Sequence, residues 1–316
     1  MKILVTGGTG MLGSRLVEKM SRTDDVFVFA RDAPKKNIGT GIKIVFGDLK
    51  SVDDLESAFA KQKFDAVYHL AANMDESDPK MYYENVLGTK YVIEACRKHG
   101  VKRLVFMGSC GATGYGKVSK EDSPYRPNTR YEKSKADSEK LVRDSGLPYA
   151  IIRAPIIIGP NSMWAKIAGA AIKKYPVIGS GKNHFHLAYV DDVVSLLLLV
   201  KTGSKSENQV FNVATKDVKT YSEVYEIICR ELKIRKTEKH VPVFMVMAAA
   251  FLHEAASKLT GKKPKLTMMR SSIKRLIVER VVSTEKAKQV LGFVPEYDTE
   301  SAVRNAISQL RDEKML

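Results

Sequence analysis

The sequence predicts an α/β protein built on a doubly wound parallel sheet, with a smaller, mostly helical C-terminal substrate domain. Short apolar runs alternate with amphipathic stretches of helical length through the first half of the chain, which is typical of βαβ units. The runs are almost continuously apolar and show no in–out alternation, as expected when helices cover both faces of a sheet. A glycine-rich segment follows the first run directly, where a phosphate-binding turn is expected in such folds.

The strands are expected where β-branched and aromatic residues cluster. In chain order, they fall at residues 2–6, 26–30, 42–46, 66–70, 103–107, 150–153 and 210–213. Helices are expected where apolar residues recur at helical spacing, at residues 14–21, 52–61, 84–99, 134–144, 191–201 and 221–232. A further apolar run over 241–252 is broken only by Pro242. We therefore expect a sheet domain at 1–160 and 189–214 and a smaller domain at 161–188 and 215–316.

Composition excludes several classes of protein. The chain has 316 residues, of which 44% are apolar and 28% charged, which is ordinary globular usage. The three cysteines form no C-x-x-C pair, so we expect no disulfide framework and no metal site. The first strand begins at once and no apolar run reaches 18 residues, so neither a signal peptide nor a spanning helix is expected. A cytoplasmic location is the prediction.

The glycine segment Gly7-x-x-Gly10-x-x-Gly13 lies between the first expected strand and the first helix. Glycines allow a tight turn and a close approach of the backbone to a diphosphate, which the helix N-terminus attracts. This position at the start of a strand-first α/β chain is typical of a Rossmann-type dinucleotide site.

The end of the second strand discriminates between the two nicotinamide dinucleotides. Arg31 stands there, with Lys35 and Lys36 just beyond, and a guanidinium suits a 2′-phosphate. We therefore predict NADP(H) as the preferred cofactor. Asp32 follows Arg31 and offers a carboxylate to a ribose hydroxyl, which keeps NAD(H) open. Asp48-Leu49 follows the third strand and is placed to meet the adenine.

Tyr131 and Lys135 are separated by four positions at the start of an expected helix, so their side chains share one face. A neighbouring ammonium is expected to lower the pKa of a phenol, which makes the tyrosine a usable general acid or base. The lysine can also bind the nicotinamide ribose. The pair indicates a catalytic site more strongly because it follows the glycine loop and a strand ending in Gly108-Ser109-Cys110.

Together these motifs resemble the extended short-chain dehydrogenase/reductase family, within the NAD-dependent epimerase/dehydratase superfamily. The resemblance covers nearly the whole chain. It rests on Thr6–Gly13, Gly47-Asp48-Leu49, His69-Leu70-Ala71-Ala72, Asn85-Val86-x-Gly88-Thr89, Tyr131-x-x-x-Lys135, Arg153-x-Pro155-x-x-x-Gly159-Pro160 and Tyr189-Val190-Asp191-Asp192-Val193. It implies a catalytic set of a hydroxyl residue, Tyr131 and Lys135. It assigns cofactor contacts to Gly7, Thr9, Gly10, Met11, Leu12, Arg31, Lys35, Lys36, Asp48, Leu49, Leu70, Ala71, Ala72, Tyr131, Lys135, Pro155 and Ile158.

The hydroxyl member of that set is where the chain departs from the family. Relatives usually carry two adjacent hydroxyl residues after the fifth strand, whereas this chain has Ser109 followed by Cys110. A thiol is a poor hydrogen-bond donor. We predict that Ser109 binds the substrate oxygen, with Thr113 as the reserve and a loop-capping role for Ser109 as the structural alternative.

Two features favour one branch of the family. Ile156 stands where nucleotide-sugar enzymes carry an Asn, and the tail from Arg280 to Pro295 lacks their R-P-G-D segment. The tail resembles that of the 3β-hydroxysteroid dehydrogenase / dihydroflavonol reductase branch. We therefore predict an NADP(H)-dependent oxidoreductase that reduces a ketone or aldehyde, or oxidises the alcohol, of a fairly apolar substrate. The alternatives are a nucleotide-sugar epimerase/dehydratase and a non-catalytic NADP(H)-binding or sensor protein.

The substrate region offers several candidate pocket residues, for each of which an ordinary core or loop role is the alternative. The apolar candidates are Met163, Trp164, Ile167, Phe185 and the run Val243–Met247, and the polar ones are His184 and His186.

The charge balance bears on partners. Lys and Arg total 52 against 36 Asp and Glu, a net charge of +16, yet no nucleic-acid motif accompanies it. The excess is spread along the chain, and solubility is its simplest interpretation. The apolar run 241–252 precedes a basic stretch, which is typical of a helix lying on an anionic membrane; a dimer contact or a pocket wall are the alternatives. Among partners we expect a small-molecule substrate, a homodimer through residues 84–99 and 132–144, and possible peripheral membrane contact.

Overall fold

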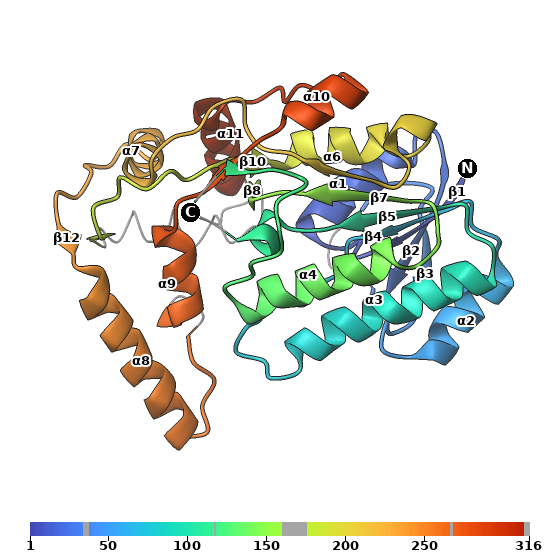
Figure 1. Cartoon of the computed structure of the whole chain (residues 1–316), viewed down its shortest axis with the longest axis horizontal. Coiled ribbons are helices and arrows are strands. Elements are labelled where there is room, and N and C mark those ends of the chain that lie inside the picture. Colours follow the sequence, from blue (N-terminus) through green and yellow to red (C-terminus); the bar gives the residue numbers. More distant parts are fainter. Residues whose placement is uncertain (34–37, 115, 117, 160–175, 266–267, 313–316) are drawn as a thin grey trace.

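The computed structural model describes residues 1–33, 38–114, 116, 118–159, 176–265 and 268–312. Its centre is a seven-stranded sheet in the order β11-β7-β5-β4-β1-β2-β3, shown in Figure 1. All six pairings in this sheet are parallel. The strands are Lys2–Thr6 (β1), Asp25–Ala30 (β2), Lys43–Phe46 (β3), Ala66–His69 (β4), Arg103–Met107 (β5), Tyr149–Arg153 (β7) and Gln209–Asn212 (β11). The predicted fold class is confirmed.

The order of the strands reverses at β1. Its neighbours are β2 on one side and β4 on the other. The chain therefore adds β2 and β3 on one side of β1 and then crosses to add β4, β5, β7 and β11 on the other side. Loops at the carboxyl ends of strands beside such a reversal diverge and leave a crevice, where dinucleotides bind in this type of sheet. The glycine segment lies at that end of β1.

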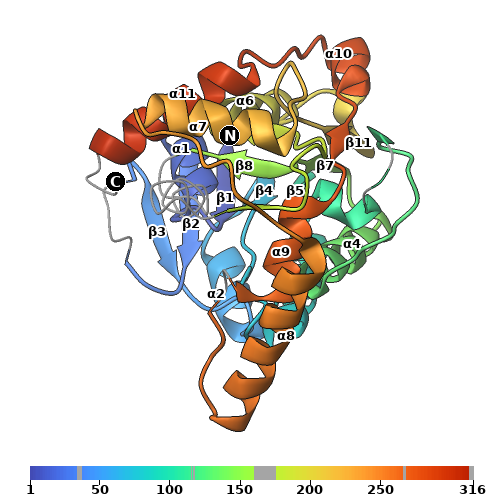
Figure 2. The same ribbon diagram turned by 90° about the vertical axis from the view of Figure 1, so that its left-hand side faces the viewer.

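Helices cover both faces of the sheet (Figures 1 and 2). The helices Met11–Met20 (α1) and Val190–Leu199 (α6) contact each other on one face. The helices Val52–Lys61 (α2), Met81–Lys98 (α3) and Arg130–Arg143 (α4) lie on the other, with α3 packed along α4. Two separate apolar clusters, one on each face, pack against the main sheet, and a third includes residues of the C-terminal third of the chain.

Helix boundaries follow local capping chemistry. We expected the helix that carries Lys135 to begin at residue 134, but α4 begins at Arg130. Thr129 accepts a hydrogen bond from the backbone N–H of Glu132, whose carboxylate accepts one from Thr129. This reciprocal cap satisfies two of the free donors of the first turn. It places Tyr131 and Lys135 on the same rigid helix.

The C-terminal third adds helices and short strands. The helices Tyr221–Glu231 (α7) and Thr299–Asp312 (α11) pack against each other. Three two-stranded parallel ladders, none of them predicted, join distant parts of the chain. They pair Ile156–Ile158 (β8) with Leu187–Tyr189 (β10), Val177–Ile178 (β9) with His240–Val241 (β12), and Val118–Ser119 (β6) with Val281–Val282 (β13).

Five further helical elements complete the part of the chain that the structure describes. The α-helix Val243–Leu259 (α8) stands away from the body and packs on Arg270–Ile277 (α9). The helix Glu285–Leu291 (α10) returns to β11, and its Ala287 joins the core on one face of the main sheet. Short 3-10 turns occupy Cys110–Thr113 (η1) and Ser204–Ser206 (η2). Among the described residues, no helix combines the length and apolarity needed to cross a membrane.

Candidate active site

The glycine loop is fixed by close backbone packing. Gly7 has a φ of 74°, which favours glycine, and its carbonyl accepts a hydrogen bond from the N–H of Gly10 at 3.1 Å. A Cβ on Gly13 would lie 2.1 Å from the Gly7 oxygen, and one on Gly7 would lie 2.6 Å from the nitrogen of Ala71. The first and third glycines therefore allow α1 to approach the ends of β1 and β4.

Gly10 differs from the other two glycines. A Cβ there would meet only the Gly7 oxygen, at 3.4 Å, so its outer side is open. Gly10 caps α1 without a side-chain hydrogen bond, and the first turn of α1 carries no acidic residue. A helix N-terminus of this kind attracts a phosphate, so the loop fits the diphosphate of a dinucleotide. Thr9 is exposed beside it, and Met11 and Leu12 are half-buried.

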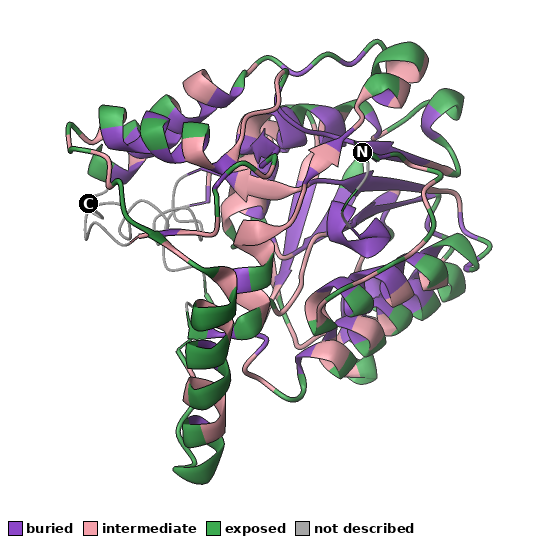
Figure 3. Cartoon of the chain, turned by 60° about the vertical axis from the view of Figure 1, so that its left-hand side comes forward, coloured by how far each residue is buried: buried purple, intermediate pink, exposed green. Residues whose placement is uncertain are grey.

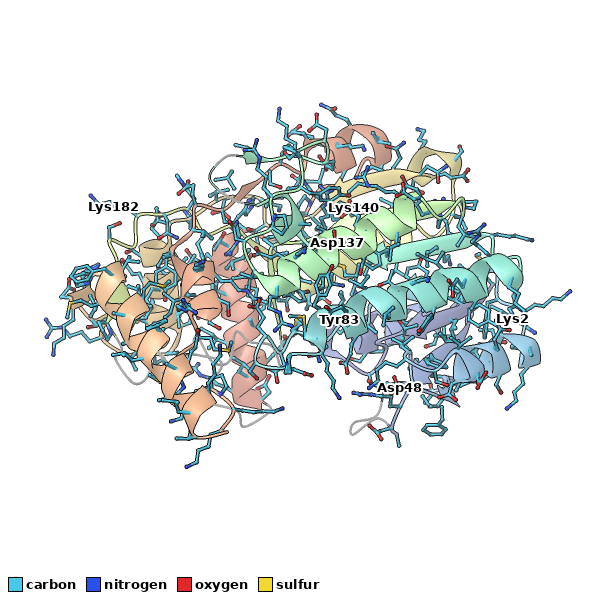
Figure 4. The ribbon with its side chains drawn as sticks, turned by 60° about the horizontal axis from the view of Figure 1, so that its bottom comes forward. Lys2, Asp48, Tyr83, Asp137, Lys140 and Lys182 are labelled. Carbon is cyan, nitrogen blue, oxygen red and sulfur yellow. The ribbon has the colours of Figure 1, made fainter. Side chains whose placement is uncertain are left out.

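The predicted ribose and adenine contacts lie at the ends of the next strands. Arg31 and Asp32 are both exposed after β2, whereas Lys35 and Lys36 lie outside the described residues. Asp48 and Leu49 are half-buried after β3, and Asp48 can be followed in Figure 4. The structure thus leaves both the Arg31 and the Asp32 alternatives available to a cofactor.

The remaining predicted cofactor contacts follow β4 and β7. Leu70, Ala71 and Ala72 are half-buried directly after β4, and Pro155 is half-buried after β7. Ile158 is fully buried and belongs to the core cluster that contains α7 and α11. The side chain of Ile158 therefore reaches a cofactor only if the core around it rearranges, whereas its backbone needs no such change. The assignment of Ile158 as a cofactor contact stays a prediction.

A polar chain behind the glycine loop was not predicted. Thr6 Oγ1 and His69 Nδ1 are 2.7 Å apart, and His69 Nε2 lies 3.1 Å from Thr89 Oγ1. Thr89 in turn donates to the carbonyl oxygen of Asn85. Burial, with the charge of Lys135, lowers the pKa of His69 to about 3, so the ring is neutral. The chain joins β1, β4 and α3, and its sequence signal was the polar residue ending each apolar strand.

Lys135 is buried between α4 and β5. Its Nζ donates to the carbonyl oxygen of Met107 at 2.9 Å and lies 4.9 Å from the centroid of the Phe106 ring. Burial lowers the pKa of Lys135 to about 8, against the opposing effect of Glu139. The ammonium is thus held at the carboxyl end of β5, beside the crevice.

A buried ion pair fixes this helix to the sheet. Glu139, one turn after Lys135, accepts hydrogen bonds from Arg153 Nε and Nη2 at 2.9 and 2.6 Å. Both side chains are at most 1% exposed, and Tyr125 also donates to Glu139. Two-point contacts of this kind fix geometry as well as charge. The arginine of the R-x-P motif therefore positions α4.

Tyr131 is half-buried, and its cationic neighbour is not the one that we expected. Burial raises the pKa of Tyr131 to about 12, and the opposing effect comes from Arg275. The guanidinium carbon of Arg275 lies 5.4 Å from the centroid of the Tyr131 ring, and Arg275 pairs with the buried carboxylate of Glu76. The prediction that Lys135 lowers the pKa of Tyr131 is wrong for this structure, in which Arg275 is the cation that acts on the phenol.

Of the three candidates for the hydroxyl role, two are turned inward. Cys110 is buried, and Thr113 donates to its carbonyl while lying 2.7 Å from Ser119 Oγ. Ser109 is half-buried and accepts a hydrogen bond from the N–H of Gly111 at 3.2 Å. The loop-capping alternative for Ser109 is therefore realised here, and Ser109 is also the most accessible of the three.

The candidate pocket residues divide into three groups. Phe185 is fully buried in the core, and His186 is buried between the carbonyl of Thr215 and the N–H of Val282. His184 is exposed and pairs with Glu279. The run Val243–Met247 begins α8, where its members are exposed or half-exposed. Met163, Trp164 and Ile167 lie outside the described residues.

Comparisons with known proteins agree with this architecture. The sequence model of the NAD dependent epimerase/dehydratase family matches residues 3–214. The chain is 30% identical to the decarboxylating sterol-4-alpha-carboxylate 3-dehydrogenase of Saccharomyces cerevisiae, over 97% of both chains. It is 27% identical to the N-acetyl-alpha-D-glucosaminyl-diphospho-ditrans,octacis-undecaprenol 4-epimerase of Escherichia coli O157:H7, over 93% of this chain and 91% of that protein. The Thermus thermophilus UDP-glucose 4-epimerase, solved with NAD, superposes with a TM-score of 0.76 at 25% identity, covering 98% and 99% of the two chains.

Proposed function

The chain belongs to the NAD-dependent epimerase/dehydratase family and is an NAD(P)-dependent enzyme of the extended short-chain dehydrogenase/reductase type, and from that premise we propose its reaction. It interconverts a secondary alcohol and its ketone, or a primary alcohol and its aldehyde, on an apolar substrate. The observation that carries the proposal is the placement of Tyr131 and Lys135 on one capped helix at the carboxyl edge of β5.

The cofactor fits the loop described above. Gly10 leaves space for a diphosphate at the N-terminus of α1, and Arg31 is exposed where a 2′-phosphate would lie. When bound, the nicotinamide accepts or supplies the hydride. We propose NADP(H) as the preferred form, with Asp32 as the ribose contact if NAD(H) is preferred instead.

The side chains divide the proton chemistry between them. Tyr131 donates the proton to the carbonyl oxygen during reduction and accepts it during oxidation. Ser109, the accessible hydroxyl, holds the same oxygen. Lys135, buried against Met107, holds the ribose. Arg275 lies over the Tyr131 ring and favours its ionised form.

The apolar character of the substrate rests on two kinds of support. Ile156 occupies the place where a polar contact to a nucleotide sugar would stand. Two relatives that match this chain over more than nine-tenths of its length are named for a sterol and for an undecaprenol diphosphate sugar. Both of these molecules carry a large hydrocarbon part. The substrate-binding part would comprise residues 161–188 and 215–316, as the sequence predicts, and the enzyme would be a dimer.

A second candidate function is the epimerisation of a nucleotide sugar, which the same catalytic set would perform by transient oxidation. The superposition on a UDP-glucose 4-epimerase over nearly the whole chain favours it. An epimerase regenerates its own cofactor, so it would act on a sugar nucleotide without added NAD(P). The non-catalytic NADP(H)-binding role that the sequence left open is not pursued, because the family and the relatives of this chain are enzymes.

The test begins with a fluorescence titration of the purified protein with NADPH and NADH in parallel. Tighter binding of NADPH is expected, followed by its oxidation in the presence of apolar ketones such as 3-ketosteroids. Tighter binding of NADH would transfer the ribose contact to Asp32. If turnover appeared only with sugar nucleotides, the second candidate would replace the first, and if neither dinucleotide bound, the proposal would fall.

A further inference from the structure

Most of the apolar residues of the helix α8 face the solvent. Of the nine residues in α8 that are exposed, eight are apolar and the ninth is Lys258. Five large side chains, Phe244, Met245, Phe251, Leu252 and Leu259, are between 53% and 89% exposed. A helix on the surface of a globular protein normally turns such residues towards the core. Figure 3 shows this exposed face standing away from the body.

The polar residues of α8 point towards the protein instead. Glu254 pairs with Arg270 of α9, with 2.8 Å between Oε2 and Nη2, and it also accepts the backbone N–H of Arg270. The ring of His253 accepts a hydrogen bond from the N–H of Lys265, and Ser257 is buried. These contacts fix the rotation of the helix about its axis. The outward apolar face is therefore part of the native arrangement.

Basic residues gather at the far end of this face. Lys258 is followed by Lys262, Lys263 and Lys265, and all four are exposed. No ion pair between described residues includes Lys258, Lys262 or Lys265. An apolar helix face bordered by free lysines matches the interface of an anionic bilayer, which takes up the apolar side chains and attracts the cations.

We propose that α8 and the following lysines dock this protein onto an anionic lipid surface. The lysines beside α8 argue for lipid over a second copy of the chain on this face. In a two-fold contact through α8, Lys258, Lys262 and Lys265 would lie close to the same residues of the other copy, whereas an anionic surface attracts them. The labelled lysines of Figure 4 show that the general excess is scattered, since Lys2 and Lys182 lie at opposite ends of the molecule. The combination of free lysines with an apolar face is the particular property of α8.

The same segment leads to the candidate active site. Helix α9 packs on α8, and its Arg275 lies over the ring of Tyr131. A protein docked through α8 thus holds its catalytic tyrosine close to the lipid. The link to an apolar substrate rests on the function proposed above, whereas the docking surface itself depends only on α8.

The experiment uses the full chain without cofactor, so that its outcome is independent of catalysis. Sedimentation is measured with vesicles of phosphatidylcholine alone and with vesicles containing about one third phosphatidylserine. We expect binding to the anionic vesicles at low salt, and weaker binding at high salt. The paired change Met245→Ser with Leu252→Ser should weaken binding at least tenfold. The matched control, Leu199→Ser with Val294→Ser, removes exposed apolar side chains elsewhere and should bind like wild type.

A second pair of variants tests the charge. Lys262→Glu with Lys265→Glu should also weaken binding at least tenfold, because each lysine near the surface contributes a factor of about five. Lys61→Glu with Lys63→Glu makes the same change in net charge at exposed positions far from α8 and should have little effect. Circular dichroism confirms that each variant is folded.

Three outcomes would overturn the proposal. The first is that wild type does not bind anionic vesicles at low salt. The second is that both α8 variants bind as well as their controls. The third is a change from dimer to monomer in sedimentation velocity for the Met245/Leu252 variant without any effect on vesicles, which would assign the face to a second copy.

Discussion

The guanidinium of Arg275 lies over the ring of Tyr131, with 5.4 Å between the guanidinium carbon and the ring centroid. The two residues come from different parts of the chain, Tyr131 from α4 and Arg275 from α9. Arg275 also pairs with Glu76, in the loop after β4. The contact therefore ties the C-terminal segment to the candidate site and sets the charge next to the phenol.

Removing the cation is expected to shift the pH dependence of the reaction. Arg275 lowers the pKa of Tyr131 while burial raises it, so Arg275→Gln should raise this pKa. Alcohol oxidation needs the phenolate, and its rate should therefore rise at a higher pH than in wild type. Ketone reduction needs the neutral phenol, so its rate should not fall over the same pH range. The pH profile of kcat/KM in both directions is the measurement, with Arg270→Gln as the control from the same helix.

Loss of the phenol hydroxyl tests the catalytic assignment. Tyr131→Phe should lower turnover by about 10² to 10⁴, the usual contribution of a positioned acid or base, while the affinity for NADPH is unchanged. Tyr82→Phe, on the neighbouring helix, loses only a hydrogen bond to Asp137 and should keep full activity. Steady-state rates and cofactor titrations on both variants decide the matter, and full activity of Tyr131→Phe would refute the mechanism.

Two glycines of the loop should respond differently to the same change. Gly13→Ala places a methyl group 2.1 Å from the Gly7 oxygen, so it should lower the free energy of unfolding by about 1–3 kcal/mol and abolish cofactor binding. Gly10→Ala meets only a contact at 3.4 Å and should fold normally. Its methyl group would occupy the space of the diphosphate, so the affinity for NAD(P)H should fall at least tenfold. Thermal melts and titrations separate the two effects; equal stability loss in both variants would contradict this assignment.

The cofactor preference depends on a pair of adjacent residues. Arg31→Ala should weaken NADPH binding by about 10 to 100-fold, as expected for lost hydrogen bonds to a charged group, and leave NADH unaffected. Asp32→Ala should leave NADPH binding unchanged. The opposite result, in which only Asp32→Ala weakens binding and NADH is the affected cofactor, would assign the site to NAD. Equilibrium titrations at constant ionic strength provide the comparison.

The buried ion pair predicts a large effect on stability. Glu139→Gln leaves the guanidinium of Arg153 buried without its carboxylate, and breaking such a pair costs on the order of 3–5 kcal/mol. Glu300→Gln removes exposed pairs with Arg230 and Arg304 and should cost about 1 kcal/mol or less. Urea unfolding of both variants measures the difference. Similar values for the two would show that the Glu139 pair does not fix α4.

Much of the fold could be predicted because its signals are local. All seven strands of the sheet were expected within one residue at each end, and the helix α2 was expected with its bounds Val52–Lys61. A buried parallel strand is an unbroken apolar run, and a helix face repeats with its own period. The fold follows from those two patterns together with the glycine loop.

The parts that could not be predicted depend on contacts between distant residues. The three short ladders pair segments far apart in the sequence, and two-residue strands carry no periodicity. Arg275 belongs to a basic stretch whose members cannot be distinguished until the fold shows which one reaches Tyr131. The reversed orientation of α8 depends in the same way on Glu254 and Arg270. Its apolar run was visible in the sequence, but the direction in which it faces was not.

The pairing of β6 with β13 has a consequence for the order in which the protein is made. Val118 lies between β5 and α4, and its partner Val281 is encoded close to the end of the chain. During synthesis, the strands and helices that form the main sheet therefore leave the ribosome long before β13, which pairs with the segment that follows Ser109. Assembly that proceeds from the N-terminus passes through an intermediate with a finished dinucleotide crevice and an unfinished reaction centre. Catalytic competence is then the last property that the nascent chain acquires.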